Sequence, residues 1–167
     1  MKKVLLLFLT PIIFSSCQQK LIRPLKGSYP SDYTVVSEKS SDEIWDNVIA
    51  FCSKNGIPIK LTDRKTGLII SKPYKLVSYT YENQDGTPRE KEANVIIGCE
   101  SVGTLIADCQ LPTIIWTNII FKLNEENNKT SLTVRLSDLT AWYSQWRYLK
   151  EAKSTGRLEK QIIKEIF

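Results

Sequence analysis

Residues 40–55 most constrain what this chain can fold into. Ser40 and Glu43 stand three residues apart, the spacing of a capping box, whose side chains satisfy backbone N–H groups at a helix start. The apolar side chains that follow recur three, four and seven residues apart: Ile44, Trp45, Val48, Ile49, Phe51 and Cys52. Gly56 then supplies the left-handed residue that ends many helices. The segment therefore predicts an amphipathic helix, whose apolar face must pack against another element.

A β-hairpin is predicted directly after this helix. Ile57, Ile59 and Leu61 alternate with polar residues, as the inward side chains of a half-buried strand do. Turn residues at 63–67 and a second apolar run at 68–70 complete the hairpin. We therefore expect Trp45 to be buried between the helix and the sheet that contains this hairpin.

Alternating patterns elsewhere predict the rest of a sheet. Residues 33–38 predict a first strand, and residues 76–81 and 93–98 predict a second hairpin with a long polar tip over 82–91. The two strongest strand patterns, 114–123 and 132–136, are joined by a turn-rich segment. Polar positions on these two strands predict one solvated face: Lys122, Thr130 and Thr133.

A second helix is predicted at the C-terminus. Its apolar side chains have helical spacing: Leu158, Ile162, Ile163, Ile166 and Phe167. Thr155 stands where it could cap this helix. Because the connections between strands are hairpin-sized, residues 32–167 predict a single α+β domain, a mostly antiparallel sheet with two helices packed on one face.

The helix and hairpin resemble a unit of known envelope proteins. The resemblance is to BamC-type lipoproteins, accessory parts of the outer-membrane β-barrel assembly machinery, and its residues are Ile44, Trp45, Val48, Gly56, Ile57, Pro58, Ile59, Asp63, Gly67, Leu68 and Ile69. The whole chain, including residues 154–159, is similar to uncharacterised Bacteroides-type lipoproteins, from which no activity can be transferred. The first resemblance bears on the fold rather than on a partner, and the second implies a lipoprotein.

Residues 1–16 have the pattern of a secretory signal peptide. Lys2 and Lys3 form a short positive region, an apolar run follows, and Ser15 and Ser16 are the small residues of a cleavage site. The apolar run is about half of the roughly 20 residues that a membrane-spanning helix needs, and it contains Pro11. We therefore expect a cleaved leader and no transmembrane helix.

Residues 14–17 resemble the bacterial lipobox, in which two small residues precede a cysteine. The resemblance implies that Cys17 carries a diacylglyceryl group that anchors the chain in a membrane, while a plain cleaved signal with an accidental cysteine is the alternative. Residues 17–31 have linker composition and predict a flexible tether. Gln18 and Gln19 replace the acidic residues that mark other destinations, which implies the periplasmic side of the outer membrane, with the cell surface as the alternative.

Three further cysteines bear on compartment. Cys52 lies on the apolar helix face and is expected to be a buried thiol. Cys99 and Cys109 flank a predicted turn and could form a disulfide, worth about 2–3 kcal/mol in an oxidising compartment. Two unpaired thiols remain the alternative, because sequence alone does not give their geometry.

Catalytic patterns are scarce in this sequence. It contains no histidine and therefore no Ser–His or Cys–His pair, and its cysteines lack metal-site spacing. Four carboxylates share one loop, but they are interleaved with basic residues and predict a solvated tip rather than a glycosidase pair: Glu82, Asp85, Glu90 and Glu92. The formal net charge of +5 falls to +3 without the leader, which is too small and too dispersed to indicate nucleic acid. We expect no enzyme activity, metal or cofactor.

The aromatic stretch 142–148 is the candidate binding surface. It contains Trp142, Tyr143, Trp146, Arg147 and Tyr148. Two interpretations remain open, because these rings could form a platform for a sugar ring or partner side chain, or could pack on the sheet as one face of a helix. We expect Trp142 to lie inside and Tyr143 and Arg147 outside, since an arginine inside would need a paired carboxylate. The sequence thus predicts a lipid-anchored binding or scaffold module with an envelope protein partner, or alternatively a glycan- or peptidoglycan-binding lipoprotein.

Overall fold

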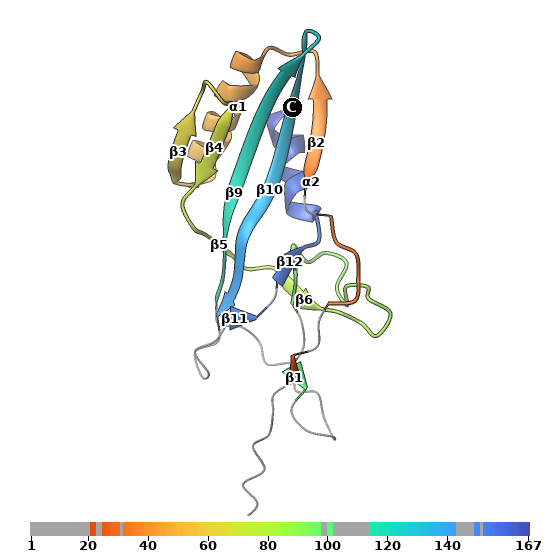
Figure 1. The fold of residues 1–167 in the computed structure, drawn as a ribbon. Coiled ribbons are helices and arrows are strands. Elements are labelled where there is room, and N and C mark those ends of the chain that lie inside the picture. Colours follow the sequence, from red (N-terminus) through yellow and green to blue (C-terminus); the bar gives the residue numbers. More distant parts are fainter. Residues whose placement is uncertain are drawn as a thin grey trace, which may run out of the picture.

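The computed structural model describes residues 21–22, 25–30, 32–97, 100–101, 114–142, 149–150 and 152–167 (Figure 1). Its elements in chain order are β1 (Leu21–Ile22), β2 (Tyr33–Ser37), α1 (Ser41–Lys54), β3 (Ile59–Asp63), β4 (Leu68–Ser71), β5 (Tyr74–Leu76), β6 (Tyr79–Tyr81), β7 (Val95–Ile97), β8 (Glu100–Ser101), β9 (Ile114–Glu126), β10 (Lys129–Trp142), β11 (Leu149–Lys150), β12 (Ala152–Ser154) and α2 (Arg157–Ile166). Neither helix in the described part of the chain is long and apolar enough to cross a membrane.

The long hairpin of β9 and β10 is the centre of a seven-stranded antiparallel sheet. The main strand order is β11-β10-β9-β4-β3, with β2 also pairing with β10 and β5 with β9. Asn127 and Asn128 form the tip, with φ angles of 52° and 59°. Two consecutive left-handed residues match the twist of the flanking strands, and asparagine tolerates this conformation better than most residues.

Both helices cover the same face of this sheet, which confirms the predicted α+β class (Figure 1). The inward side chains of β9 are all buried: Ile115, Thr117, Ile119, Phe121 and Leu123. They share one core with the apolar face of α1, where Trp45 is only 8% exposed, as the sequence predicts. Ile162 and Ile166 of α2 complete this layer.

The predicted capped helix and first hairpin are confirmed. The backbone N–H of Glu43 donates to Ser40 Oγ at 3.2 Å, and Gly56 has a φ of 62° after the helix end. β3 and β4 then pair antiparallel through a turn that ends at Gly67. A Cβ on Gly67 would lie 2.3 Å from the carbonyl oxygen of Leu123, so only glycine fits here.

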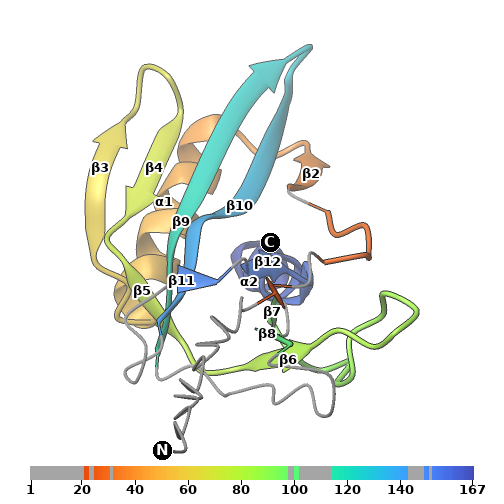
Figure 2. The ribbon, with the colours of Figure 1, turned by 60° about the horizontal axis from the view of Figure 1, so that its bottom comes forward.

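The predicted hairpin of residues 76–81 and 93–98 is wrong. Residues 74–81 divide into β5, which joins the main sheet, and β6, which pairs in parallel with β7 in a separate small sheet (Figure 2). The polar segment between β6 and β7 folds back along β6. The N–H of Arg89 donates to the Tyr81 carbonyl at 2.9 Å, and the N–H of Asn94 donates to Ser78 Oγ at 3.3 Å. The chain has therefore already turned back when β7 begins, so β7 runs in the direction of β6.

The C-terminal helix is present, but Thr155 is not its cap. The N-cap is Gly156 with a φ of 82°, and the hydroxyl of Thr155 instead donates to the Ala93 carbonyl at 2.6 Å. Ser154 Oγ accepts from the N–H of Gly156 at 2.9 Å and donates to Glu159 at 2.8 Å. The hydrogen bond of the Thr155 hydroxyl to Ala93, which is far along the chain, therefore replaces the cap that the sequence predicts at Thr155.

Residues 25–30, within the predicted linker, lie against the domain. The carboxylate of Glu82 accepts from the backbone N–H groups of Lys26 at 2.8 Å and Gly27 at 2.7 Å, and from the Tyr29 hydroxyl at 2.8 Å. The Tyr29 hydroxyl also lies 2.8 Å from the Gly86 carbonyl oxygen, so its single proton is shared between Glu82 and Gly86. We call residues 25–30 the strap.

The signal peptide at 1–16, Cys17, Cys99 and Cys109 lie outside the described residues, while Cys52 is a buried free thiol as expected.

Candidate binding surface

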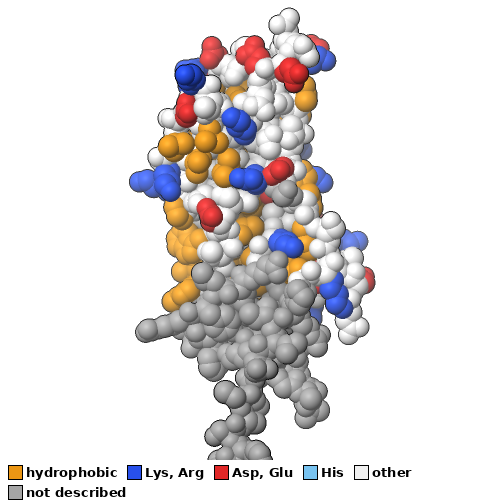
Figure 3. Space-filling view, viewed as in Figure 1, with side chains coloured by type: hydrophobic (Ala, Val, Ile, Leu, Met, Phe, Trp, Pro, Cys, Tyr) orange, Lys and Arg blue, Asp and Glu red, His pale blue; other side chains and the backbone are white. Residues whose placement is uncertain are grey.

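Among the described residues, no helix packs on one face of the sheet, and we call it the open face. Its members follow from the strand register, because side chains that alternate with the buried ones point away from the helices. They include Thr34, Val36, Leu61, Asp63, Leu68, Ile70, Lys75, Ile114, Trp116, Asn118, Ile120, Lys122, Asn124, Ser131, Thr133, Arg135, Ser137, Thr140 and Trp142. Figure 3 shows apolar side chains gathered on this side of the molecule.

The open face is unusually apolar for a solvated sheet surface. Leu61 is 45% exposed and Trp116 is 38% exposed, while Leu68, Ile70 and Ile120 are half-buried between their neighbours. A contiguous apolar area on a small domain is a common mark of an interaction site.

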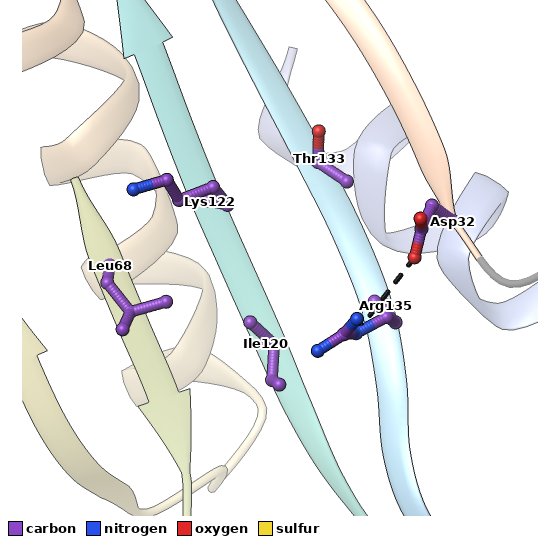
Figure 4. A pocket seen from close by; sticks show the side chains of 6 residues that line it. All are labelled: Asp32, Leu68, Ile120, Lys122, Thr133 and Arg135. Atoms are coloured by element: carbon purple, nitrogen blue, oxygen red, sulfur yellow. Dashed lines mark ion pairs between the residues drawn. The ribbon is translucent and has the colours of Figure 1, made fainter. Parts of the chain in front are cut away.

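A shallow groove of about 240 Å³ crosses this face between β4 and β2 (Figure 4). Leu68 and Ile120 form its apolar floor. Lys122 and Arg135 project from β9 and β10 at its sides, and they are diagonal neighbours because Lys122 pairs with Thr133 and Ile120 with Arg135. The groove thus combines an apolar floor with cationic rims.

The cations of the open face are only loosely engaged. Arg135 Nε lies 3.9 Å from Asp32 Oδ1, with both side chains 49% exposed, and such pairs contribute little. Lys122 Nζ donates to the Thr66 carbonyl. Lys75 on β5 makes no ion pair with any residue that the structure describes.

The carboxylates near this face are engaged within the chain. Asp63 accepts from the N–H groups of Lys65 at 3.1 Å and Thr66 at 3.3 Å, and the hydroxyl and N–H of Thr66 are the main cause that lowers the pKa of Asp63. Asp138 Oδ2 accepts from Asn118 Nδ2 at 2.7 Å. The open face therefore presents its positive groups more freely than its negative ones.

A β-bulge in β10 lies at the middle of the open face. The register of β9 and β10 shifts between Ser137 and Thr140, and Asp138 has a φ of 52°. The Thr117 hydroxyl donates to the Ser137 carbonyl at 2.8 Å and so satisfies an acceptor that the bulge removes from the ladder. Bulges often re-aim side chains beside functional sites. Asn118 Oδ1, beside this bulge, is buried and has no hydrogen-bond partner among the described residues.

The bulge explains why the expectation that Trp142 lies inside is wrong. Up to Leu136, the even-numbered residues of β10 are buried; past the bulge, Ala141 is buried and Trp142 is 39% exposed. Trp142 pairs with Ile114 and Thr140 with Trp116, so both indoles lie diagonally on the open face. The helix interpretation of this stretch fails at its described ends, since Trp142 is in β10 and Leu149 in β11. Tyr143, Trp146, Arg147 and Tyr148 lie outside the described residues.

The predicted solvated face was correct only in part. Lys122 and Thr133 are on the open face, but Thr130 is 1% exposed on the helix side, because residues 130 and 133 have opposite parity. Trp116 was missed as a surface residue. Strict alternation from Ile115 to Leu123 could have placed Trp116 opposite the core side chains.

The carboxylates of residues 82–92 have structural contacts rather than a shared site. Glu82 holds the strap; Asp85 accepts from Thr87 N at 2.9 Å and Thr87 Oγ1 at 2.7 Å, which lowers its pKa; and Glu92 pairs with Arg157. No group of metal-binding side chains occurs in the described ranges.

Two buried titratable groups lie on the helix side of the sheet. Burial raises the pKa of Cys52 to about 11, which leaves its thiol protonated and unreactive. Burial also raises the pKa of Glu159, while the Ser154 hydroxyl and the backbone N–H groups of Glu159 and Leu136 oppose that shift. Ser154 also lines a cavity of about 330 Å³ at the bulged edge of β10, together with Tyr29 and Asp138. Glu159 lies in the first turn of α2, so we assign it a structural role at the start of that helix.

Comparison with known proteins does not place this chain in a family. No family model matches it, and no curated protein matches it. The solved structure of the di-domain ARO/CYC BexL from the BE-7585A biosynthetic pathway is similar to it at 17% identity, over 64% of this chain and 36% of that one, with a TM-score of 0.19. A similarity at that level carries no argument about function.

Proposed function

We propose that this chain is a lipid-anchored envelope protein that acts as a binding or scaffold module in outer-membrane assembly or maintenance, and that its open face is the docking surface. One observation carries the proposal: both helices cover the same face of the sheet, while the other face exposes Trp116, Leu61 and Trp142. A small domain that leaves such side chains in water loses stabilisation that a partner would restore.

The anchor part of the proposal rests on the leader pattern and the residues that follow it. Cys17 precedes Leu21 of β1 by four residues, which span at most about 14 Å when extended. With the strap held by Glu82, the domain would lie close to the membrane surface. We place it on the periplasmic side of the outer membrane, with the cell surface as the alternative.

Glycan binding is a second candidate, favoured by a different observation. Trp116 and Trp142 lie diagonally on neighbouring strands. Asn118 Oδ1, which has no hydrogen-bond partner among the described residues, lies two residues from Trp116 on β9. Exposed indoles beside polar groups suit the apolar faces and hydroxyls of sugar rings. This arrangement would let the chain bind peptidoglycan or another glycan.

Site-directed photocrosslinking in intact cells tests the docking surface. We expect a photoreactive amino acid at Trp116 to yield a discrete protein adduct, and the same group at Lys164, exposed on α2, to yield none. Equal adducts from both positions, or none from Trp116, would refute the docking surface. Retention of the wild-type chain on purified peptidoglycan, lost in Trp116→Ala, would instead favour the glycan candidate.

A further inference from the structure

We propose that the open face binds an amphipathic helix with acidic flanks, supplied by a partner protein. This inference rests on the proposed function, because it names the chemistry of the partner that docks on the same surface. Three features of the face carry it: the shape of its apolar strip, the placement of its cations and the engagement of its carboxylates.

The apolar strip runs along β9 and the adjoining β4. It contains Ile114, Trp116 and Ile120 on β9, continued by Ile70 and Leu68 on β4, which pair with Ile120 and Lys122. From residue 114 to residue 122, at about 3.4 Å per residue, the strip is roughly 27 Å long. A helix of about 18 residues has the same length. On the opposite face, α1 and α2 already show how this sheet accepts the apolar faces of helices.

Cations border the strip along its length. Lys75 pairs with Trp116 across β5 and β9, while Lys122 and Arg135 flank Ile120. Their distribution suits a ligand with negative charges at several positions along its flanks. Lys75 lies beside Trp116, six residues or about 20 Å along β9 from Lys122, so a single compact anion cannot contact all three cations.

Carboxylates do not neutralise these cations strongly. Asp63 is held in its own turn, where hydrogen bonds from Thr66 lower its pKa most and the charge of Lys122 least, and no ion pair joins Asp63 and Lys122 among the described residues. Asp138 is held by Asn118, and Asp32 approaches Arg135 only at 3.9 Å and half-exposed. A partner with acidic flanks can therefore replace water around Lys75, Lys122 and Arg135 without breaking a short ion pair. A basic partner would meet repulsion on the same rows.

Binding of designed peptides to the full mature chain in detergent tests this inference. The probe is a fluorescein-labelled helical peptide of about 18 residues, with leucines on one face and glutamates on both flanks. Its control has lysines in place of the glutamates. We expect fluorescence anisotropy to show binding of the acidic peptide at least tenfold tighter than that of the basic one, weakening as salt rises from about 0.05 to about 0.5 M.

Variants locate the binding on the open face. Arg135→Glu and Lys75→Glu should each weaken binding of the acidic peptide roughly tenfold. Lys164→Glu makes the same charge reversal on the helix side and should change binding less than about twofold. Circular dichroism of each variant verifies folding, and Arg135→Ala provides a milder change at the same position. Tryptophan emission should shift to shorter wavelength in the complex, as that of an indole leaving water does, and the shift should be smaller in Trp116→Phe.

Several results would overturn the inference. The inference would fail if both peptides bound equally, if Lys164→Glu weakened binding as much as the open-face variants, or if the acidic peptide did not bind. It would also fail if anionic lipid vesicles bound through Arg135 and Lys75 while the peptide did not bind. Failure of the docking surface itself is distinguishable. A crosslinked adduct at Trp116 without peptide binding would reject only the acidic helix, whereas absence of any adduct would reject the surface.

Discussion

Replacing Glu82 with alanine should release the strap while leaving the domain folded. In the structure one carboxylate accepts three hydrogen bonds, from Lys26 N, Gly27 N and the Tyr29 hydroxyl. Alanine removes all three acceptors together. The crowding at Gly27, where a Cβ would lie 2.3 Å from the Gly86 carbonyl, shows how closely the strap approaches the loop that it contacts.

The magnitude follows from these contacts. Hydrogen bonds to a charged acceptor contribute about 1.5–3 kcal/mol each when shielded and less where water competes, so three partly exposed ones amount to about 3 kcal/mol for local opening. This free energy corresponds to a roughly 100-fold loss of protection. The effect is confined to the strap, because the main core lies elsewhere and contributes most of the global stability.

Hydrogen–deuterium exchange at the amides of Lys26 and Gly27 measures this opening directly, since these N–H groups are the donors. Trypsin cleavage after Lys26 is an independent measure. Glu90→Ala is the matched control, because Glu90 is an exposed carboxylate of the same loop whose side chain makes no hydrogen bond or ion pair with residues 25–30. Unchanged exchange in Glu82→Ala, or an equal change in Glu90→Ala, would refute our account of the strap.

The same contact should depend on pH. Partial burial alone would raise the pKa of Glu82, but the hydrogen bonds from Lys26, Gly27 and Tyr29 together with the charge of Lys26 lower it below its ordinary value. A lowered pKa in the folded state means that the stabilisation is complete above the ordinary carboxyl pKa and is lost as pH falls through the lowered one. An acid-tolerant protease should therefore cleave the wild-type strap faster only at acidic pH. In Glu82→Ala the cleavage rate should not show this increase as the pH falls.

Three further predictions concern the core, a buried acid and the anchor. Trp45→Ala should cost about 3–5 kcal/mol in urea unfolding, since it empties a buried aromatic site; a cost below about 1 kcal/mol would mean that the site is not packed. Because the folded pKa of Glu159 is raised, wild-type stability relative to Glu159→Gln should fall as pH rises through that pKa, and a difference constant from pH 4 to pH 8 in urea unfolding would contradict the assigned burial. Cys17→Ser should abolish incorporation of a palmitate analogue and accumulate as precursor, and equal labelling of wild type and variant would rule out lipidation at Cys17.

The candidate site shows how far local patterns reach. The stretch 142–148 drew attention to Trp142, and the structure places that side chain on the open face. The expectation that it lies inside failed because a bulge between Ser137 and Thr140 reversed the alternation of β10. The sequence marks this bulge only by Ser137 and Asp138, residue types that also occur on the solvated face of a regular strand. Trp116, Lys75 and Arg135 join Trp142 on one surface only through strand pairing, which spans up to 67 residues along the chain between Lys75 and Trp142.

The sequence by itself determined the elements whose causes are local. The cap at Ser40, the helix end at Gly56 and the Asn127–Asn128 tip depend on neighbouring residues, so their patterns predicted α1, the β3–β4 hairpin and the long β9–β10 hairpin. Only the tertiary structure decided the parallel pairing of β6 with β7, the hold of Glu82 on the strap and the bond of the Thr155 hydroxyl to Ala93 in place of a cap on α2. In each of these cases a hydrogen bond between residues far apart in the chain outweighed a local preference worth a kilocalorie or so, and no periodicity encodes such a partner.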